Sequence, residues 1–148
     1  MKLRNLLFIA LSLFITGAYA QTAVTKVTVK DEVYYLTKNI GYNITGIYKY
    51  ESKGEPIVQL NEDGTGLFQL HDMSQTKMVW GIECDAKGAP KALKTDWGFA
   101  YRLWYQIKEK HKGKTWESGV IDEWDIVQFS VHTDEKKIYI LGERIKEY

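Results

Sequence analysis

The sequence predicts an all-β protein: a single antiparallel up-and-down β-barrel of about eight strands, with an extra hairpin or extension at its N-terminal side. Three observations support this fold class. Apolar residues beyond residue 25 recur at every second position, which is the period of a strand. β-Branched and aromatic residues dominate these positions. Short apolar runs follow one another at spacings of roughly 8–15 residues, with turn-forming residues between them.

Alternation places the expected strands one after another along the chain. The first two, residues 25–29 and 34–37, are separated by Asp31-Glu32 and form the expected extra hairpin. Asp63-Gly64 is the clearest turn signal, because Asp-Gly favours the positive φ angles of a tight hairpin. A helix stays open as an alternative for residues 102–111, which are rich in residues that helices tolerate. Further strands are expected at residues 44–51, 56–61, 66–71, 78–84, 101–108, 115–117, 127–131 and 136–145, with a turn at 112–114.

The first 20 residues are typical of a secretory signal peptide. Lys2 and Arg4 precede an apolar run over residues 6–15, and Ala18-Tyr19-Ala20 supplies the small residues of a cleavage site. The run is about ten residues long, whereas a membrane-spanning helix needs about 20. We therefore expect a mature domain of residues 21–148 that is periplasmic or secreted. Since the only cysteine is Cys84, no lipid attachment is expected at the new N-terminus.

Charge and composition exclude several classes of function. The chain has 20 basic and 19 acidic residues, and loss of Lys2 and Arg4 with the signal peptide leaves a formal charge of −1. Nucleic-acid binding calls for a basic face, so no such partner is expected. Apolar runs beyond residue 20 are at most four residues long, so no transmembrane helix is expected in the mature chain. No linker divides it, which predicts one domain.

One short motif resembles a known family. Gly46-Ile47-Tyr48 opens an expected strand, and Arg144 lies near the end of the chain. Together with the signal peptide and the short hairpins, this pattern resembles the small lipocalin-like (calycin-like) β-barrels secreted by Gram-negative bacteria, which have no established reaction. In that superfamily the first barrel strand carries Gly-x-Trp, and an Arg near the last strand packs across the ring. The resemblance implies that Gly46, Tyr48 and Arg144 close the barrel, with Tyr in place of Trp.

The sequence predicts no metal, cofactor or nucleophilic site. Residues 61–72 have the spacing of a calcium loop, but expected strands rather than helices flank them, so an ordinary turn is predicted. Cys84 shares a strand face with Trp80 and Ile82, which predicts a buried, inert thiol. The three histidines have no second ligand at metal spacing; they are His71, His111 and His132.

Aromatic content is the remaining functional signal, since all five Trp and nine of the ten Tyr lie beyond residue 20. Trp80, Tyr101 and Tyr105 lie on inward-facing positions, either as core or as the lining of a cavity. We expect a non-enzymatic barrel that binds a small apolar or amphipathic molecule there, oriented by Arg102 or Gln106 if a bulge turns either one inward.

Two alternatives stay open. One is an envelope protein-interaction or inhibitor module that uses exposed tryptophans as anchors, namely Trp97, Trp116 and Trp124. The other is a glycan hydrolase that uses the carboxylates of Asp122-Glu123-Trp124-Asp125. The default interpretation of that acidic run is a solvated turn before a strand.

Overall fold

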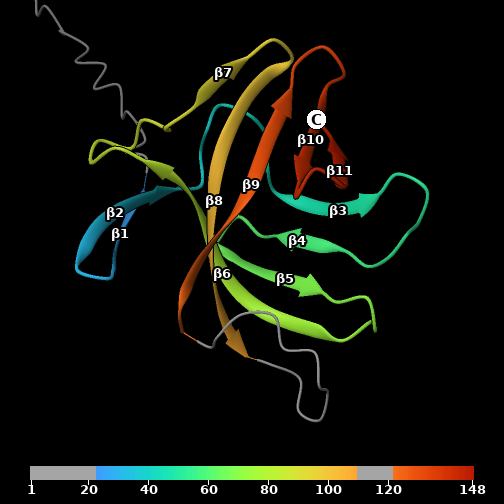
Figure 1. The fold of residues 1–148 in the computed structure, drawn as a ribbon, viewed down its shortest axis with the longest axis horizontal. Coiled ribbons are helices and arrows are strands. Elements are labelled where there is room, and N and C mark those ends of the chain that lie inside the picture. The colour runs from blue at the N-terminus through green and yellow to red at the C-terminus, as the bar shows by residue number, and fades with distance from the viewer. Residues whose placement is uncertain (1–22, 110–121) are drawn as a thin grey trace, which may run out of the picture.

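The computed structural model describes residues 23–109 and 122–148, and every regular element within these ranges is a β-strand (Figure 1). The expected signal peptide, turn 112–114 and strand 115–117 lie outside them. No helix in the described residues is long and apolar enough to cross a membrane. The strands are β1 (Val24–Val29), β2 (Glu32–Thr37), β3 (Gly46–Tyr50), β4 (Val58–Leu60), β5 (Thr65–Gln69), β6 (Gln75–Cys84), β7 (Leu93–Thr95), β8 (Gly98–Glu109), β9 (Trp124–His132), β10 (Lys137–Ile140) and β11 (Arg144–Glu147).

Eight of these strands close into an antiparallel barrel in the order β3-β4-β5-β6-β8-β9-β10-β11. The last strand returns to the first, with Arg144 opposite Tyr50. β6 pairs with β8 from Lys77 to Ile82, and this ladder completes the circle. The predicted all-β, up-and-down, eight-stranded barrel is therefore confirmed. The helical alternative for residues 102–111 is wrong as far as Glu109, because β8 is a strand throughout.

The predicted extra hairpin is confirmed as β1 and β2. β2 pairs with the end of β6, with Leu36 opposite Glu83, and the hairpin lies on the opposite side of β8 from β3, β4 and β5 (Figure 1). It covers a patch of the barrel wall at Trp104, which is buried with Val27 and Leu36 in a second apolar cluster. A Cβ at Gly81 would lie only 2.8 Å from that of Leu36, so glycine permits this close approach.

The barrel interior is packed with side chains. Inward and outward positions alternate along each strand, as the period-two pattern predicts. Tyr48 and Phe129 are both fully buried and meet edge to face, with ring centroids 6.3 Å apart. Cys84 is a buried free thiol, so packing rather than a disulfide holds the core together. The core cluster consists of Ile40, Ile44, Tyr48, Val58, Leu60, Met78, Trp80, Ile82, Tyr101, Leu103, Phe129, Val131, Ile138 and Ile140.

Residues with positive φ place two turns differently from the sequence prediction. The first hairpin turns at Lys30 and Asp31, with φ of 49° and 65°, one residue earlier than expected. The single strand expected at residues 136–145 is wrong. Leu141 and Gly142 have φ of 57° and 70°, so the chain reverses there and forms β10 and β11 instead. This reversal places Arg144 beside β3.

Leu36→Ala tests whether the hairpin is packed on the barrel. We expect it to lower the free energy of unfolding by about 2–4 kcal/mol, because a buried side chain is lost and the backbone of Gly81 cannot fill the space. Urea unfolding followed by tryptophan fluorescence measures this change. Val33→Ala is the matched control, because Val33 is 46% exposed on the same strand, and it should change stability by less than about 0.5 kcal/mol. Equal losses in the two variants would contradict the packing described.

Candidate functional site

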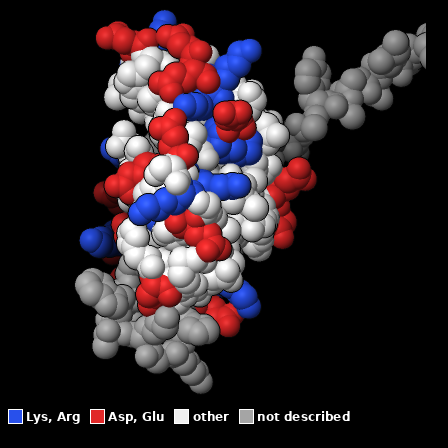
Figure 2. All heavy atoms as spheres, turned by 90° about the vertical axis from the view of Figure 1, so that its right-hand side faces the viewer, with Lys and Arg blue, Asp and Glu red and all other residues white. Residues whose placement is uncertain are grey.

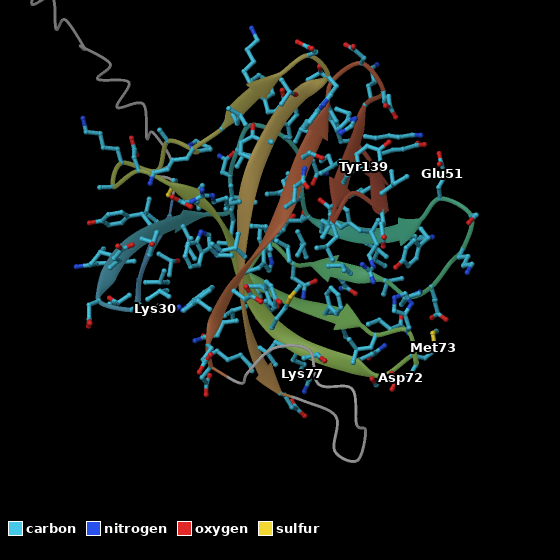
Figure 3. All side chains as sticks on the ribbon, viewed as in Figure 1. Lys30, Glu51, Asp72, Met73, Lys77 and Tyr139 are labelled. Atoms are coloured by element: carbon cyan, nitrogen blue, oxygen red, sulfur yellow. The ribbon has the colours of Figure 1, made fainter. Side chains whose placement is uncertain are left out.

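The barrel has two ends with different side chains. Turns 61–64 and 133–136 and the C-terminal Tyr148 lie at one end, which we call the Tyr148 end. Loop 51–57 and turns 70–74 and 141–143 lie at the other, which we call the Arg144 mouth. Glu51, Asp72 and Met73 lie on the rim of the Arg144 mouth (Figure 3).

A segment of the chain itself plugs the Tyr148 end. Residues 38–45 connect the N-terminal hairpin to β3, and their Ile40 and Ile44 are buried in the core cluster. Lys146 Nζ donates a hydrogen bond to the backbone carbonyl of Asn43 at 2.7 Å, and the ring of Tyr42 meets that of Tyr148 edge to face. The barrel is therefore closed at this end by apolar packing and by contacts to its last strand.

The three residues predicted to bind a ligand all lie on inward-facing strand positions, but they do not converge on one opening. Trp80 is opposite Tyr105, and its Nε1 donates to the carbonyl of Thr65 at 2.8 Å. Trp80 and Tyr101 are buried in the core cluster, while Tyr105 is half-buried against it. The Tyr105 hydroxyl donates to Asp125 Oδ2 at 3.1 Å, and burial raises the pKa of Tyr105 to about 12.

Tyr101 belongs to the Tyr148 end. Burial raises its pKa, and the neighbouring Tyr42 and Tyr148 add to that increase. Its ring meets Phe129 edge to face at 6.2 Å between centroids. Tyr101 and Tyr105 thus face opposite ends of the barrel, and of the three predicted residues Tyr105 has the most surface open to a ligand.

Two of the predicted closure residues make tight contacts near the start of β3. Gly46 has φ of 126°, and a Cβ there would lie 2.9 Å from the side chain of Lys146, which crosses it. Tyr48 is fully buried and its hydroxyl donates to the carbonyl of Ile44 at 2.6 Å. Burial raises the pKa of this hydroxyl. Tyr48 therefore fixes the plug segment to the barrel.

Arg144, the third closure residue, crosses the opposite end of the barrel. It is 3% exposed, and its Cζ lies 4.9 Å from the ring centroid of Tyr50 and 5.0 Å from that of Phe68. Because Phe68 belongs to β5, the side chain reaches from the last barrel strand past β3 and β4. The guanidinium thus joins the last strand to the first through Tyr50, which is two residues beyond the Tyr48 ring that the resemblance implied.

The charge of Arg144 is not balanced directly by any carboxylate in the described part of the chain. Its Nε is buried and has no hydrogen-bond partner, and the ion pairs formed among the described residues do not include it. Tyr50, whose ring lies against the guanidinium, donates a hydrogen bond from its hydroxyl to Glu143 Oε2 at 3.1 Å. Burial raises the pKa of Tyr50 and Glu143 adds to this, while Arg144 opposes it.

Apolar side chains around the Arg144 mouth retain exposed surface. Phe68, Tyr105 and Val127 face inward from β5, β8 and β9, and all three are only partly buried against the core cluster. One layer deeper, Phe129 and Ile140 are fully buried. In the described part of the chain, the mouth therefore combines a buried cation, two aromatic rings and a partly exposed apolar wall.

The most buried acid in the described residues lies outside the barrel, under the N-terminal hairpin. Glu83 is 4% exposed, accepts hydrogen bonds from Lys91 Nζ at 2.8 Å and Trp104 Nε1 at 3.1 Å, and lies 3.7 Å from Arg102. Burial raises the pKa of Glu83, but the two hydrogen bonds and the two positive charges outweigh it, so the pKa lies below its usual range. Because these partners occupy its carboxylate, we assign Glu83 a structural role.

The polar residues predicted to orient a ligand both stay on the outer face of β8. Arg102 is exposed and lies beside Glu83, while Gln106 donates to the carbonyl of Asp122. The register shift in the β6–β8 ladder comes after both of them, between Met78 and Lys77. It therefore turns neither side chain inward.

The other residues that the sequence analysis considered as possible metal ligands or nucleophiles lie apart from one another in the structure. In turn 61–64, Asp63 accepts hydrogen bonds from the backbone and hydroxyl of Thr65. Cys84 is buried, and burial raises its pKa. His71 lies 6.3 Å from Tyr50 by ring centroids, and His111 is outside the described residues. Among the residues that the structure describes, no three acids, histidines or cysteines come together as a metal site would require.

The tryptophans of the protein-interaction alternative are held by contacts within the chain. Trp97 is half-buried and stacks on His132 at 4.2 Å between centroids, and Trp124 packs against the second apolar cluster. Trp116 lies outside the described residues. In the acidic run of the hydrolase alternative, Asp122 pairs with Lys108 at 2.7 Å and Asp125 accepts from Tyr105.

Comparison of the chain with protein-family models, with curated proteins and with solved structures finds no match in any of the three.

Sequence reasoning missed the two rings that flank Arg144 and the burial of Glu83. Tyr50 was detectable, because it continues the alternation of Gly46 and Tyr48 on one strand face. Phe68 alternates with Gly66 in the same way. Glu83 had no local signal, because its burial comes from a hairpin more than 40 residues away in sequence.

Glu83→Gln should reduce the loss of stability in acid. A carboxylate whose pKa is lower in the folded than in the unfolded state stabilises the fold above its ordinary pKa, and this contribution is lost as the pH falls. We expect the parent to lose more unfolding free energy than the variant between about pH 5 and pH 3. Urea unfolding at a series of pH values measures this, with Glu62→Gln in an exposed turn as the control. Parallel curves for the parent and Glu83→Gln would contradict the assignment.

Proposed function

We propose that the protein is a non-enzymatic, secreted or periplasmic barrel that binds a small apolar or amphipathic molecule at the Arg144 mouth. The observation that supports this is the partial exposure of Phe68, Tyr105 and Val127, which face inward above a fully packed layer. Exposed apolar surface costs roughly 25 cal/mol per Å², so a ligand that covers these side chains gains binding free energy.

The packed core limits where such a ligand binds. An eight-stranded barrel is only wide enough to be filled by its own side chains or to hold one small molecule. Here Phe129, Tyr48 and their neighbours fill the middle, and the plug of residues 38–45 closes the far end. The ligand therefore binds in the mouth, with Tyr105 in its wall and with Trp80 in the layer that supports that wall.

The proposed location rests on the first 20 residues. They have the charged start, the apolar run and the small-residue end of a cleaved leader. A carrier in the periplasm or outside the cell meets apolar molecules that water dissolves poorly, and a closed barrel shields them. The lipocalin-like resemblance of Gly46 and Tyr48 supports the same class of function.

Native mass spectrometry tests the proposal for a ligand of any identity. The full chain is expressed with its own leader, and the secreted or periplasmic protein is purified without detergent. We expect a non-covalent adduct of a few hundred daltons, in line with a ligand that one small barrel can hold, which disappears on denaturation. A protein that carries no adduct and also binds no member of a panel of fatty acids, fatty alcohols and sterols would overturn the proposal.

A matched pair of substitutions on β9 locates the site. Val127→Phe fills the mouth from its inner wall and should weaken ligand binding about tenfold or more, since a ligand cannot share the space of a larger ring. Ile126→Phe adds the same ring to the outer face, where Ile126 is 40% exposed, and should leave the affinity unchanged. Titration by tryptophan fluorescence measures both, with circular dichroism to confirm the fold. Equal effects of the two variants would contradict a site in the mouth.

A further inference from the structure

We propose that Arg144 recognises an oxyanion head group, a carboxylate or a phosphate, on the amphipathic ligand of the barrel. This inference rests on the proposed function and adds the class of ligand that the same mouth accepts. Its basis is a guanidinium that is almost completely buried, stays unpaired by any described carboxylate and has a free Nε donor.

The contacts of Arg144 leave its buried Nε donor without an acceptor. A guanidinium carries five N–H donors and cannot lose its charge in a protein. Its Cζ lies over the rings of Tyr50 and Phe68, whose faces attract the charge but offer no lone pair to an N–H group. The guanidinium also lowers the pKa of Tyr50 through its charge and a side-chain hydrogen bond, but its Nε has no acceptor. Buried polar groups are normally hydrogen-bonded, and buried charges are normally paired. An unpartnered Nε in such a place therefore indicates a missing acceptor.

The arrangement of the guanidinium N–H donors indicates which kind of acceptor fits Arg144. Carboxylates and phosphates present two oxygens at the spacing of two guanidinium N–H groups, and such pairs are among the strongest hydrogen bonds in proteins. An oxyanion that accepts from Nε places a negative charge directly against the guanidinium, whereas the carboxylate of Glu143 is hydrogen-bonded to the Tyr50 hydroxyl. The ligand's apolar part then extends along Phe68 and toward Tyr105 and Val127.

The charged residues on the surface around the mouth do not by themselves create a preference for anionic ligands. Figure 2 views the molecule from the side on which the rim residues Glu51, Asp72 and Met73 lie, and acidic and basic side chains are interspersed over that face. Lys77 is paired with Glu109 at 2.8 Å, and Lys137 with Glu51 at 3.1 Å. A preference for anions must therefore come from the local charge of Arg144 rather than from a broad positive field.

The test compares three ligands with the same apolar chain: dodecanoate and dodecyl phosphate, each below its micelle concentration, and dodecanol below its solubility limit. Isothermal titration of the mature protein measures their dissociation constants. We expect at least one of the two anions to bind about tenfold or more tightly than dodecanol, which is the size of one charge-assisted hydrogen bond. Whichever anion binds more tightly identifies the head group as a carboxylate or a phosphate.

Two variants then assign the preference to Arg144. Arg144→Met should abolish the difference between the anions and dodecanol while dodecanol still binds, and Arg144→Lys should keep part of the difference because it keeps a charge. Lys49→Met is the matched control, since Lys49 is exposed on β3 and paired with Ile145 beside Arg144. It removes a cation from the outer face and should leave the preference unchanged. A purely structural role for Arg144 would change stability in these variants without changing the preference.

The outcomes separate this inference from the proposed function. If dodecanol and both anions bind the parent protein equally, the role of Arg144 in ligand recognition is overturned and the binding function stands. If none of the three binds, the inference about Arg144 is overturned, and the proposed function is decided by the native mass spectrum and the wider ligand panel. This comparison uses the parent protein alone, so it remains decisive even if Arg144→Met does not fold.

Discussion

The ladder between β6 and β8 is the interaction on which the rest of the structure depends. Without it, β6 and β8 would be the edges of an open sheet, and their unpaired backbone groups would be open to water or to another chain. With it, the eight barrel strands, β3 to β6 and β8 to β11, form a closed circle. β6 is long enough to pair with β5 along its first half and with β2 at its end, so one strand both closes the barrel and holds the N-terminal hairpin.

Closure of the barrel also fixes the volume of its interior, and the sizes of the inward-facing side chains match that volume. A small barrel tapers, so large side chains need small neighbours. Gly66 makes room for Met78 and Trp80, which lie 2.9 Å and 3.3 Å from the position where its Cβ would stand. Gly46 does the same for Lys146 at the Tyr148 end. The core is thereby filled through its middle, and polar chemistry is confined to the two ends.

The fold was predictable because its main determinant is local. Strand alternation and the Asp63-Gly64 turn are independent of distant contacts, and both are correct. The reversal at Leu141 and Gly142 was not predicted, because leucine rarely adopts a positive φ. The sequence pattern of residues 136–145 therefore predicts a single strand. The candidate site was less predictable: Arg144 was implied only by a family resemblance. The two rings that lie against Arg144 come from β3 and β5, which are distant from β11 in the sequence. Only closure of the barrel brings them next to Arg144.

The two ends of the barrel differ in how accessible they leave the interior. At the Tyr148 end, Ile40 and Ile44 insert into the core from the segment that follows the hairpin, and the Tyr48 hydroxyl binds that segment's backbone. Opening this end would expose buried apolar surface and break hydrogen bonds. The Arg144 mouth has no comparable plug in the described residues, and its inward rings are half-buried. If the proposed function holds, a ligand reaches the barrel from this end, where the nearly buried guanidinium of Arg144 lies beside the partly exposed apolar wall.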